Sequence, residues 1–134
     1  MKKVILGFVA TMLLAFGASA KEFDLQTNMH YLNSHLASLQ IAFITGDKKG
    51  AISAAKGLKK ESDALLKDEA VMKKMLPKDQ AHKVRIAQTS ASMISDYVEL
   101  MLEADRQNNR EGMQSAYFGV QRACLRCHNL VRDW

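Results

Sequence analysis

Three residues near the C-terminus have the types and the spacing for covalent haem chemistry. Cys124-Leu125-Arg126-Cys127-His128 reads C-x-x-C-H, the pattern through which c-type haem is attached. Residues three apart lie on one face of a helix, so the two thiols can add to the two vinyl groups of one haem as thioethers. The imidazole that follows is then placed to bind the iron as the proximal ligand. The motif therefore predicts one covalent haem c, attached by Cys124 and Cys127, with His128 on the iron.

Three other uses of these residues compete with haem attachment. A thioredoxin-like dithiol follows a strand in a βαβ unit, and no strand pattern precedes this motif. A zinc ion needs four ligands, and beyond the motif only His30, His35, His82 or a carboxylate remain to complete the set. A structural disulfide leaves the adjacent histidine without a role. Haem attachment uses all three residues of the motif, and it is the interpretation that we favour.

The first twenty residues predict export. A short basic start is followed by an apolar stretch from Val4 to Phe16, and the segment ends in the small-x-small pattern at Ala20 that signal peptidase reads. An uncleaved membrane anchor is the alternative, but spanning a bilayer takes about 20 apolar residues and this stretch is shorter. We therefore expect residues 1–20 to be a secretory signal peptide and residues 21–134 to be a haem domain in the periplasm. Covalent haem attachment requires thiols that are kept available in an exported protein, and the signal peptide supplies that compartment.

Composition and charge exclude several other classes of protein. The chain has 134 residues, net charge +5, one proline, seven glycines and two cysteines. Few prolines and glycines argue against an all-β chain with many turns, and two cysteines cannot form a disulfide-rich scaffold. Without the signal peptide the balance is 17 basic against 14 acidic residues, which permits weak docking to acidic redox proteins but does not indicate nucleic-acid binding. No hydrolytic or phosphate-binding motif is present, so we do not expect an enzyme.

Apolar residues recur with helical spacing along the rest of the chain. The pattern predicts helices over Asp24–Thr45, Lys48–Lys67, Asp79–Gln107 and Arg110–Arg132, and strand-like alternation is absent. A longer connection containing Pro77 separates the second helix from the third. Four amphipathic helices joined by mostly short loops form an antiparallel up-down-up-down bundle. The predicted fold class is therefore all-α, a four-helix bundle with covalently bound haem.

The sequence resembles a known family in having its C-x-x-C-H motif on the last of four helices. The sequence resembles the cytochrome c′ family, the class II c-type cytochromes, through Cys124-x-x-Cys127-His128-x-x-x-Arg132. Members of that family often carry a basic residue one turn after the proximal histidine. The resemblance implies a four-helix bundle with one haem near the C-terminus. Because dimers are common in the family, a homodimer is among the states that the resemblance allows.

The sixth ligand of the iron decides the function. In an antiparallel bundle the start of the first helix lies beside the end of the fourth. His128 is roughly 6 Å from the end of its helix and Met29 roughly 7.5 Å from the start of its own, so the two residues share one level of the bundle. The same region of the first helix supplies the distal residue in the resembling family. We expect Met29 to be the distal ligand of a low-spin haem; if it packs aside, Leu32 and Leu36 line an apolar distal pocket.

Other residues are candidates for contacts around the haem. Lys83, Arg85 and Arg132 can pair with haem propionates or contact the proximal side, because buried carboxylates favour cationic partners. His30 is the next candidate ligand, but it lies about 100° around the helix from Met29, on the polar side of the apolar stripe. These residues equally fit the role of solvated charges on helix surfaces.

Together these features predict an electron carrier that exchanges electrons with periplasmic or membrane redox proteins. The alternative is a cytochrome c′-like protein with five-coordinate iron that binds nitric oxide or carbon monoxide. A third hypothesis is a haem-bearing sensor or accessory subunit without turnover. The identity of the distal residue separates the first two.

Overall fold

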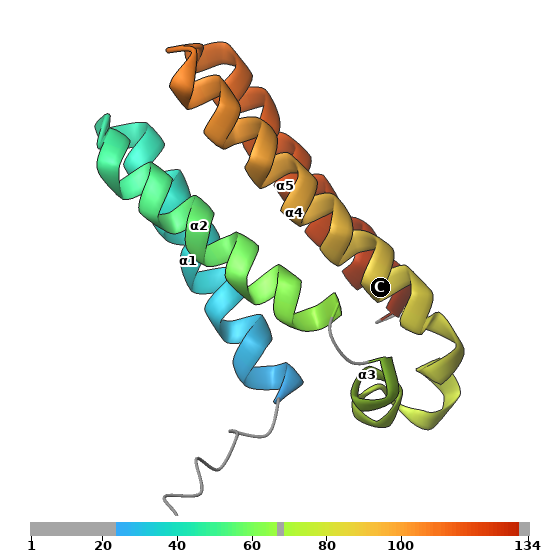
Figure 1. Cartoon of the computed structure of the whole chain (residues 1–134). Helices are drawn as coiled ribbons and strands as arrows, with labels where there is room; N and C mark the ends of the chain where they lie inside the picture. The colour runs from blue at the N-terminus through green and yellow to red at the C-terminus, as the bar shows by residue number, and fades with distance from the viewer. Residues whose placement is uncertain (1–23, 67–68, 132–134) are drawn as a thin grey trace, which may run out of the picture.

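The computed structural model describes residues 24–66 and 69–131, and this part of the chain is helical throughout, without a strand. Four long helices are joined by short segments, with one short α-helix and one 3-10 helix between the second and third (Figure 1). In chain order the elements are α1 (Leu25–Thr45), α2 (Lys48–Leu66), α3 (Glu69–Met75), η1 (Lys78–Lys83), α4 (Val84–Arg106) and α5 (Arg110–Val131). The all-helical class is thus confirmed. The signal-peptide prediction for residues 1–20 and the candidate Arg132 lie outside the described residues.

Capping groups supplied by the sequence set both ends of α1 and the starts of α2 and α5. Asp24 accepts a hydrogen bond from the backbone N–H of Thr27 (2.9 Å) at the start of α1. Gly46, in the left-handed region at φ +75°, ends that helix, and Asp47 then caps α2 through the N–H of Gly50 (2.9 Å). Asn109 does the same for α5. These local hydrogen bonds explain why both ends of α1 and the starts of α2 and α5 agree with the predicted ones to within a residue.

The third long helix begins later than the sequence pattern predicts. Pro77 has an extended backbone (φ −50°, ψ 146°), which separates α3 from the segment after it. The next six residues wind as the 3-10 helix η1, and α4 starts at Val84 instead of Asp79. A 3-10 turn is a common short connector before an α-helix, and here it places Gln80 in a buried position. His82, expected at the start of the helix, is therefore a residue of η1.

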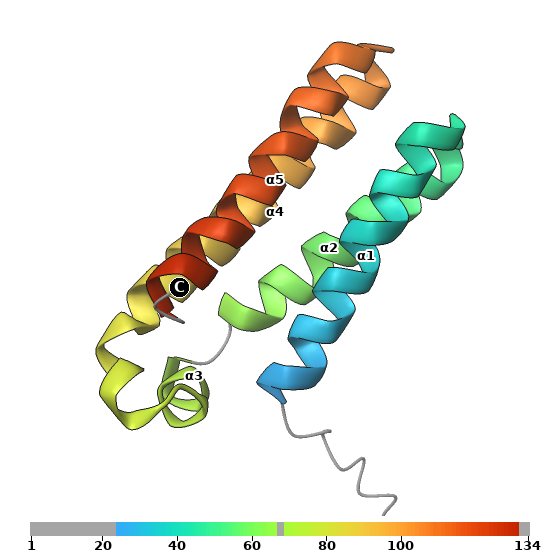
Figure 2. The same cartoon turned by 180° about the vertical axis from the view of Figure 1, so that it is seen from behind.

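The helices form two hairpins that meet along one side. The closest packing joins α1 to α2, α4 to α5, and α2 to α4, whereas α1 and α5 approach each other less closely. Figures 1 and 2 show the two hairpins side by side, with the start of α1, the end of α2, α3 and the end of α5 at one end of the molecule. The looser α1–α5 side is therefore where the motif on α5 faces the predicted distal residue on α1.

Helices α1 and α2 pack closely because α2 carries a glycine at the contact. A side-chain carbon added at Gly57 would lie 2.4 Å from Cε1 of His35, so the imidazole rests directly on the α2 backbone. Further along the same interface, Asn28 is buried and donates to the backbone carbonyl (3.1 Å) and the carboxylate (2.9 Å) of Glu61. His35 is thus held against α2, away from the α5 motif.

A polar network ties α2 to α4. Lys59 Nζ donates to Asp63 Oδ2 (3.1 Å) and to Ser95 Oγ (2.9 Å), and Ser95 in turn donates to Asp63 Oδ1 (2.9 Å). Glu99 adds a second carboxylate 3.5 Å from the ammonium group. The hydrogen bond to Asp63, with the charges of both carboxylates, raises the pKa of Lys59 above its ordinary value of 10.5.

This network predicts a pH-dependent contribution to stability. Because the folded pKa of Lys59 is raised, its contribution is complete below pH 10.5 and is lost as the pH rises through the folded value. We expect Lys59→Met to lower the free energy of unfolding by less than about 1 kcal/mol at neutral pH, since the group is partly exposed. Urea unfolding at about pH 7 and about pH 11.5 checks whether the difference from wild type shrinks. Lys56→Met, at an exposed position of α2, is the control, and a difference that does not change with pH contradicts the prediction.

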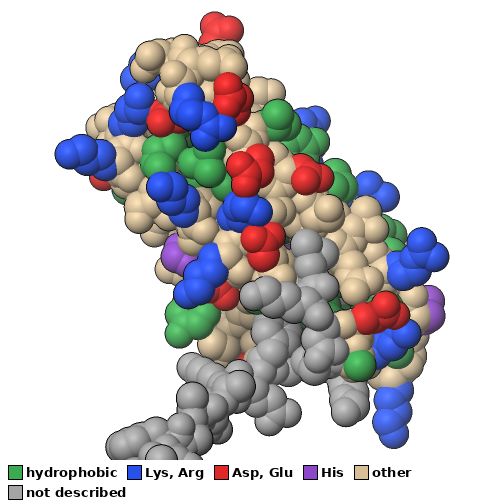
Figure 3. Space-filling view, in the orientation of Figure 1, with side chains coloured by type: hydrophobic (Ala, Val, Ile, Leu, Met, Phe, Trp, Pro, Cys, Tyr) green, Lys and Arg blue, Asp and Glu red, His purple; other side chains and the backbone are tan. Residues whose placement is uncertain are grey.

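The surface is mixed in charge. Figure 3 shows Lys and Arg side chains interspersed with Asp and Glu over the visible face, with small apolar patches between them. None of the helices in residues 24–66 and 69–131 has an apolar stretch of the length that a bilayer crossing requires.

Candidate functional site

A narrow cleft between α1 and α5 brings together the principal residues that the sequence predicted for the haem site. Three come from consecutive turns of α1 and three from the end of α5. They are Met29, Leu32, Leu36, Cys124, Cys127 and His128. The two groups are about 90 residues apart in the sequence, so packing of the hairpins creates the site.

The motif on α5 is helical over its whole length and partly buried. Cys124, Cys127 and His128 each have intermediate exposure, which leaves them accessible at the mouth of the cleft. Burial, and to a smaller degree the neighbouring Cys127, raises the pKa of Cys124 to about 11. At neutral pH this side chain is therefore the protonated thiol.

Helices α2 and α4 supply the floor of the cleft. Leu65 and Ile94 give it apolar walls, while Ala87, Ser90 and Ala91 leave space because their side chains are small. No role in the site was predicted from the sequence for Ala87, Ala91 and Ile94 of α4. The sequence did contain a signal for this floor. Three small residues, Ala87, Ser90 and Ala91, stand at positions where larger side chains such as leucine would fill the centre of a bundle.

Ser90 adds one polar group to this floor. Its side chain is 2% exposed, and its hydroxyl has no hydrogen-bond partner among the described residues. A buried hydroxyl left without a partner costs about 1–3 kcal/mol. The cleft thus offers a hydrogen-bonding group to whatever occupies it, next to an otherwise apolar lining.

The side chains that line the cleft fit a c-type haem, but the cleft is too small to hold one unless the helices move apart. The residues supply two thiols three positions apart, an imidazole, a thioether on the facing helix and apolar walls. The enclosed volume is about 80 Å³, the space of roughly three water molecules. A porphyrin ring is far larger, so seating it requires the two hairpins to stand further apart. The loose packing between α1 and α5 is where such a separation costs least.

The remaining candidates lie elsewhere. Lys83 is partly buried in η1 and Arg85 is exposed near the start of α4, and neither lines the cleft. His30 is exposed on α1, with its ring 6.2 Å from that of Tyr31. Within the described residues no three His, Cys, Asp or Glu side chains gather as a metal-binding group of their own.

The chain matches no protein-family model, no curated protein and no solved structure. The assignment of a function therefore depends on the motif and on the residues that share its cleft.

Proposed function

We propose that the chain is an exported monohaem c-type cytochrome of the cytochrome c′ family that carries electrons between redox partners. The observation that supports this most strongly is the shared cleft. Cys124, Cys127 and His128 on α5 line the same narrow space as Met29 on α1. These are the four side chains that a His/Met-ligated haem c requires.

Each of these residues has a distinct task in the proposal. Cys124 and Cys127 are covalent anchors one helical turn apart, which fix one edge of the macrocycle against α5. His128 offers a neutral imidazole as the proximal ligand, and Met29 offers a thioether from the facing helix. When bound, haem supplies a reversible one-electron change at iron, and a Met/His ligand pair raises its reduction potential.

The bundle holds these ligands on rigid elements. In the antiparallel up-down-up-down arrangement that we propose, the ligands come from two facing helices, α1 and α5, which place them on opposite sides of the cleft. The apolar side chains of Leu32, Leu36 and Ile94 line the cleft, and an apolar shell around a haem tunes its reduction potential.

The cellular setting follows from the N-terminus. In this proposal residues 1–20 are removed on export, and residues 21–134 remain in the periplasm with periplasmic or membrane redox proteins as partners. The protein transfers electrons and does not act as an enzyme or bind nucleic acid. Lys83, Arg85 and Arg132 remain proposed contacts for the propionates or the proximal side, and a homodimer is a proposed assembly.

A second function is favoured by one feature of the cleft. Leu32 and Leu36 lie beside Met29 and would form an apolar distal wall if the thioether turned away from the iron. A cavity of this kind suits a neutral diatomic gas, so the alternative is a five-coordinate haem protein that binds nitric oxide or carbon monoxide.

Haem attachment is the direct test of the proposal. Expressed in a host that attaches haem c, the exported protein should have the mass of residues 21–134 plus one haem, and neither cysteine should react with iodoacetamide after denaturation. The double variant Cys124→Ala/Cys127→Ala should carry no covalent haem. Leu125→Ala is the matched control, because this exposed residue lies between the cysteines and should leave attachment unchanged. A wild-type chain with two alkylatable thiols in such a host contradicts the proposal.

A further inference from the structure

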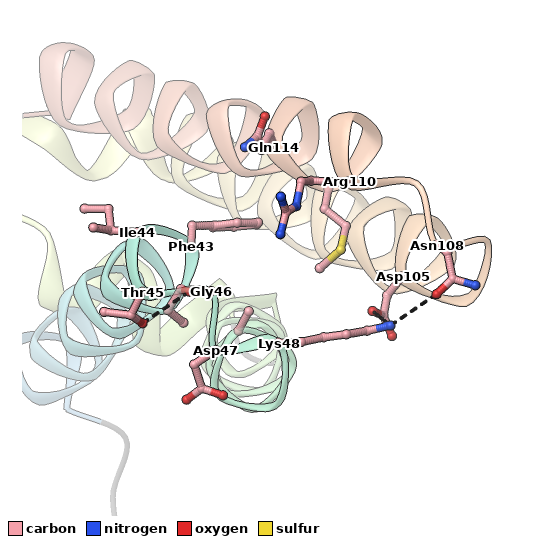
Figure 4. Close-up of a pocket in the computed structure, with 13 residues that line it drawn as sticks. Phe43, Ile44, Thr45, Gly46, Asp47, Lys48, Asp105, Asn108, Arg110 and Gln114 are labelled. Carbon is pink, nitrogen blue, oxygen red and sulfur yellow. Dashed lines mark hydrogen bonds and ion pairs between the residues drawn. The ribbon is translucent and has the colours of Figure 1, made fainter.

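A larger cavity lies at the other end of the molecule, away from the motif. It opens between the turn that joins α1 to α2 and the turn that joins α4 to α5, and its volume is about 470 Å³ (Figure 4). Cavities that bind small molecules commonly measure about 300–1,000 Å³. None of the residues proposed to hold the haem lines this space.

One side of the cavity is apolar and held in place by packing. Phe43 and Met113 face it from α1 and α5, with Ala42 and Ala51 behind them. The ring of Phe43 packs against that of Tyr117, with centroids 5.4 Å apart and planes inclined by 51°. These contacts give the wall a fixed shape before any ligand enters.

Some of the charged side chains around the cavity already form ion pairs or hydrogen bonds within the protein, and others do not. Lys48 is paired with Asp105 (3.0 Å) and lies 3.5 Å from Asn108 Oδ1, and the carboxylate of Asp47, which also lines the cavity, accepts the N–H of Gly50 (2.9 Å) at the start of α2 (Figure 4). Arg110 extends into the cavity from the start of α5 (Figure 4). Its guanidinium forms no ion pair with any described residue. Of the two cations among the described residues that line the cavity, Arg110 is therefore the one that is not paired with a carboxylate, and it shares the cavity with the apolar wall.

We propose that this cavity binds a small organic carboxylate with an aromatic or aliphatic body. The carboxylate would pair with Arg110, whose planar guanidinium suits two parallel hydrogen bonds to such a group. The body would lie against Phe43 and Met113, where it removes apolar surface from water. A neutral ligand leaves the cation unused, and an inorganic anion leaves the apolar wall unused. The site is independent of the haem proposal, because it shares no residue with the cleft.

Benzoate is a suitable probe because it combines one carboxylate with a compact apolar body. We expect titration of the purified exported protein to shift the amide resonances of the cavity residues in a saturable way, with a dissociation constant in the range of about 1 mM. Benzamide, of the same shape without the charge, should bind at least about tenfold more weakly, as should benzoate to Arg110→Gln. Arg110→Lys should retain part of the affinity, because it keeps the charge and loses the paired geometry.

Arg122→Gln is the matched control, since Arg122 lies on α5 but outside the cavity, and its affinity should equal that of wild type. Equal binding of benzoate and benzamide would overturn the proposal, as would unchanged affinity in Arg110→Gln. Inorganic phosphate that displaces benzoate at equal concentration, or no saturation by about 50 mM benzoate, would do the same. Arg110 is an exposed surface residue, so the variants should fold and each result is decisive.

Discussion

If the chain is the proposed His/Met-ligated cytochrome, replacing Met29 with leucine should turn a six-coordinate haem protein that does not react with carbon monoxide into a five-coordinate one that binds it. Leucine has nearly the volume of methionine, so the fold should lose less than about 1.5 kcal/mol. The leucine side chain has no atom that can bind iron, so His128 would be the one axial ligand that the protein still supplies. Ferric spectra should lose the long-wavelength band of thioether ligation and become high-spin. The reduction potential should fall on the order of 100 mV, within the ~0.8 V that axial ligands span.

Met93→Leu is the matched control for this prediction. Met93 is also a partly buried methionine, but it lies outside the cleft with its sulfur 3.8 Å from a guanidinium nitrogen of Arg126. Its replacement should change neither the spectrum nor the reaction with carbon monoxide. Unchanged spectra in Met29→Leu would show that another group is the distal ligand. Carbon monoxide binding by the wild-type protein would favour the gas-binding alternative instead.

The helix ends could be predicted because local chemistry sets them. Asp24, Asp47 and Asn109 satisfy backbone N–H groups within three residues, so their effect can be inferred without knowing the fold. The start of α4 could not be predicted in the same way. The segment after Pro77 has a helical pattern, but it winds as a 3-10 connector that buries Gln80 in the folded molecule.

The candidate site likewise has a part that could be predicted from local sequence and a part that depends on how the helices pack. The C-x-x-C-H motif is local, and the level of Met29 follows from the antiparallel order of the helices, so both were accessible from the sequence. The floor of the cleft depends on how α2 packs against α4, which is why Ser90 and Leu65 were missed. The cavity at the far end depends on where Arg110 points relative to the engaged Lys48, a property of the folded structure alone.

Filling the floor of the cleft is expected to block haem while leaving the haem-free fold nearly intact. Ala91 is 1% exposed and lines the cleft, so Ala91→Leu places three more carbon atoms in a space of about 80 Å³. Burial of those carbons stabilises by about 0.8 kcal/mol each, and crowding costs about 1–3 kcal/mol, so the two effects nearly cancel in the haem-free chain. Haem binding gains nothing from the substitution, because the added side chain occupies volume that the ring needs. Because the leucine side chain and the ring compete for the same space, the ratio of covalent haem to protein should fall at least about tenfold from wild type.

Ala104→Leu tests whether this loss comes from the cleft or from a weakened fold. Ala104 is a buried alanine of the same helix α4, but it lies near the opposite end and outside the cleft. Ala104 packs against α5 beside Gly112 and lines neither the cleft nor the larger cavity, so we expect this variant to lose a net of about 1–3 kcal/mol of unfolding free energy by overpacking and to keep a wild-type haem ratio. Denaturant unfolding and the haem absorbance per mole of protein measure the two quantities on the same samples. If Ala91→Leu carries a full complement of haem, the ring does not occupy the space beside Ala91, and the floor of the cleft is not part of the haem site.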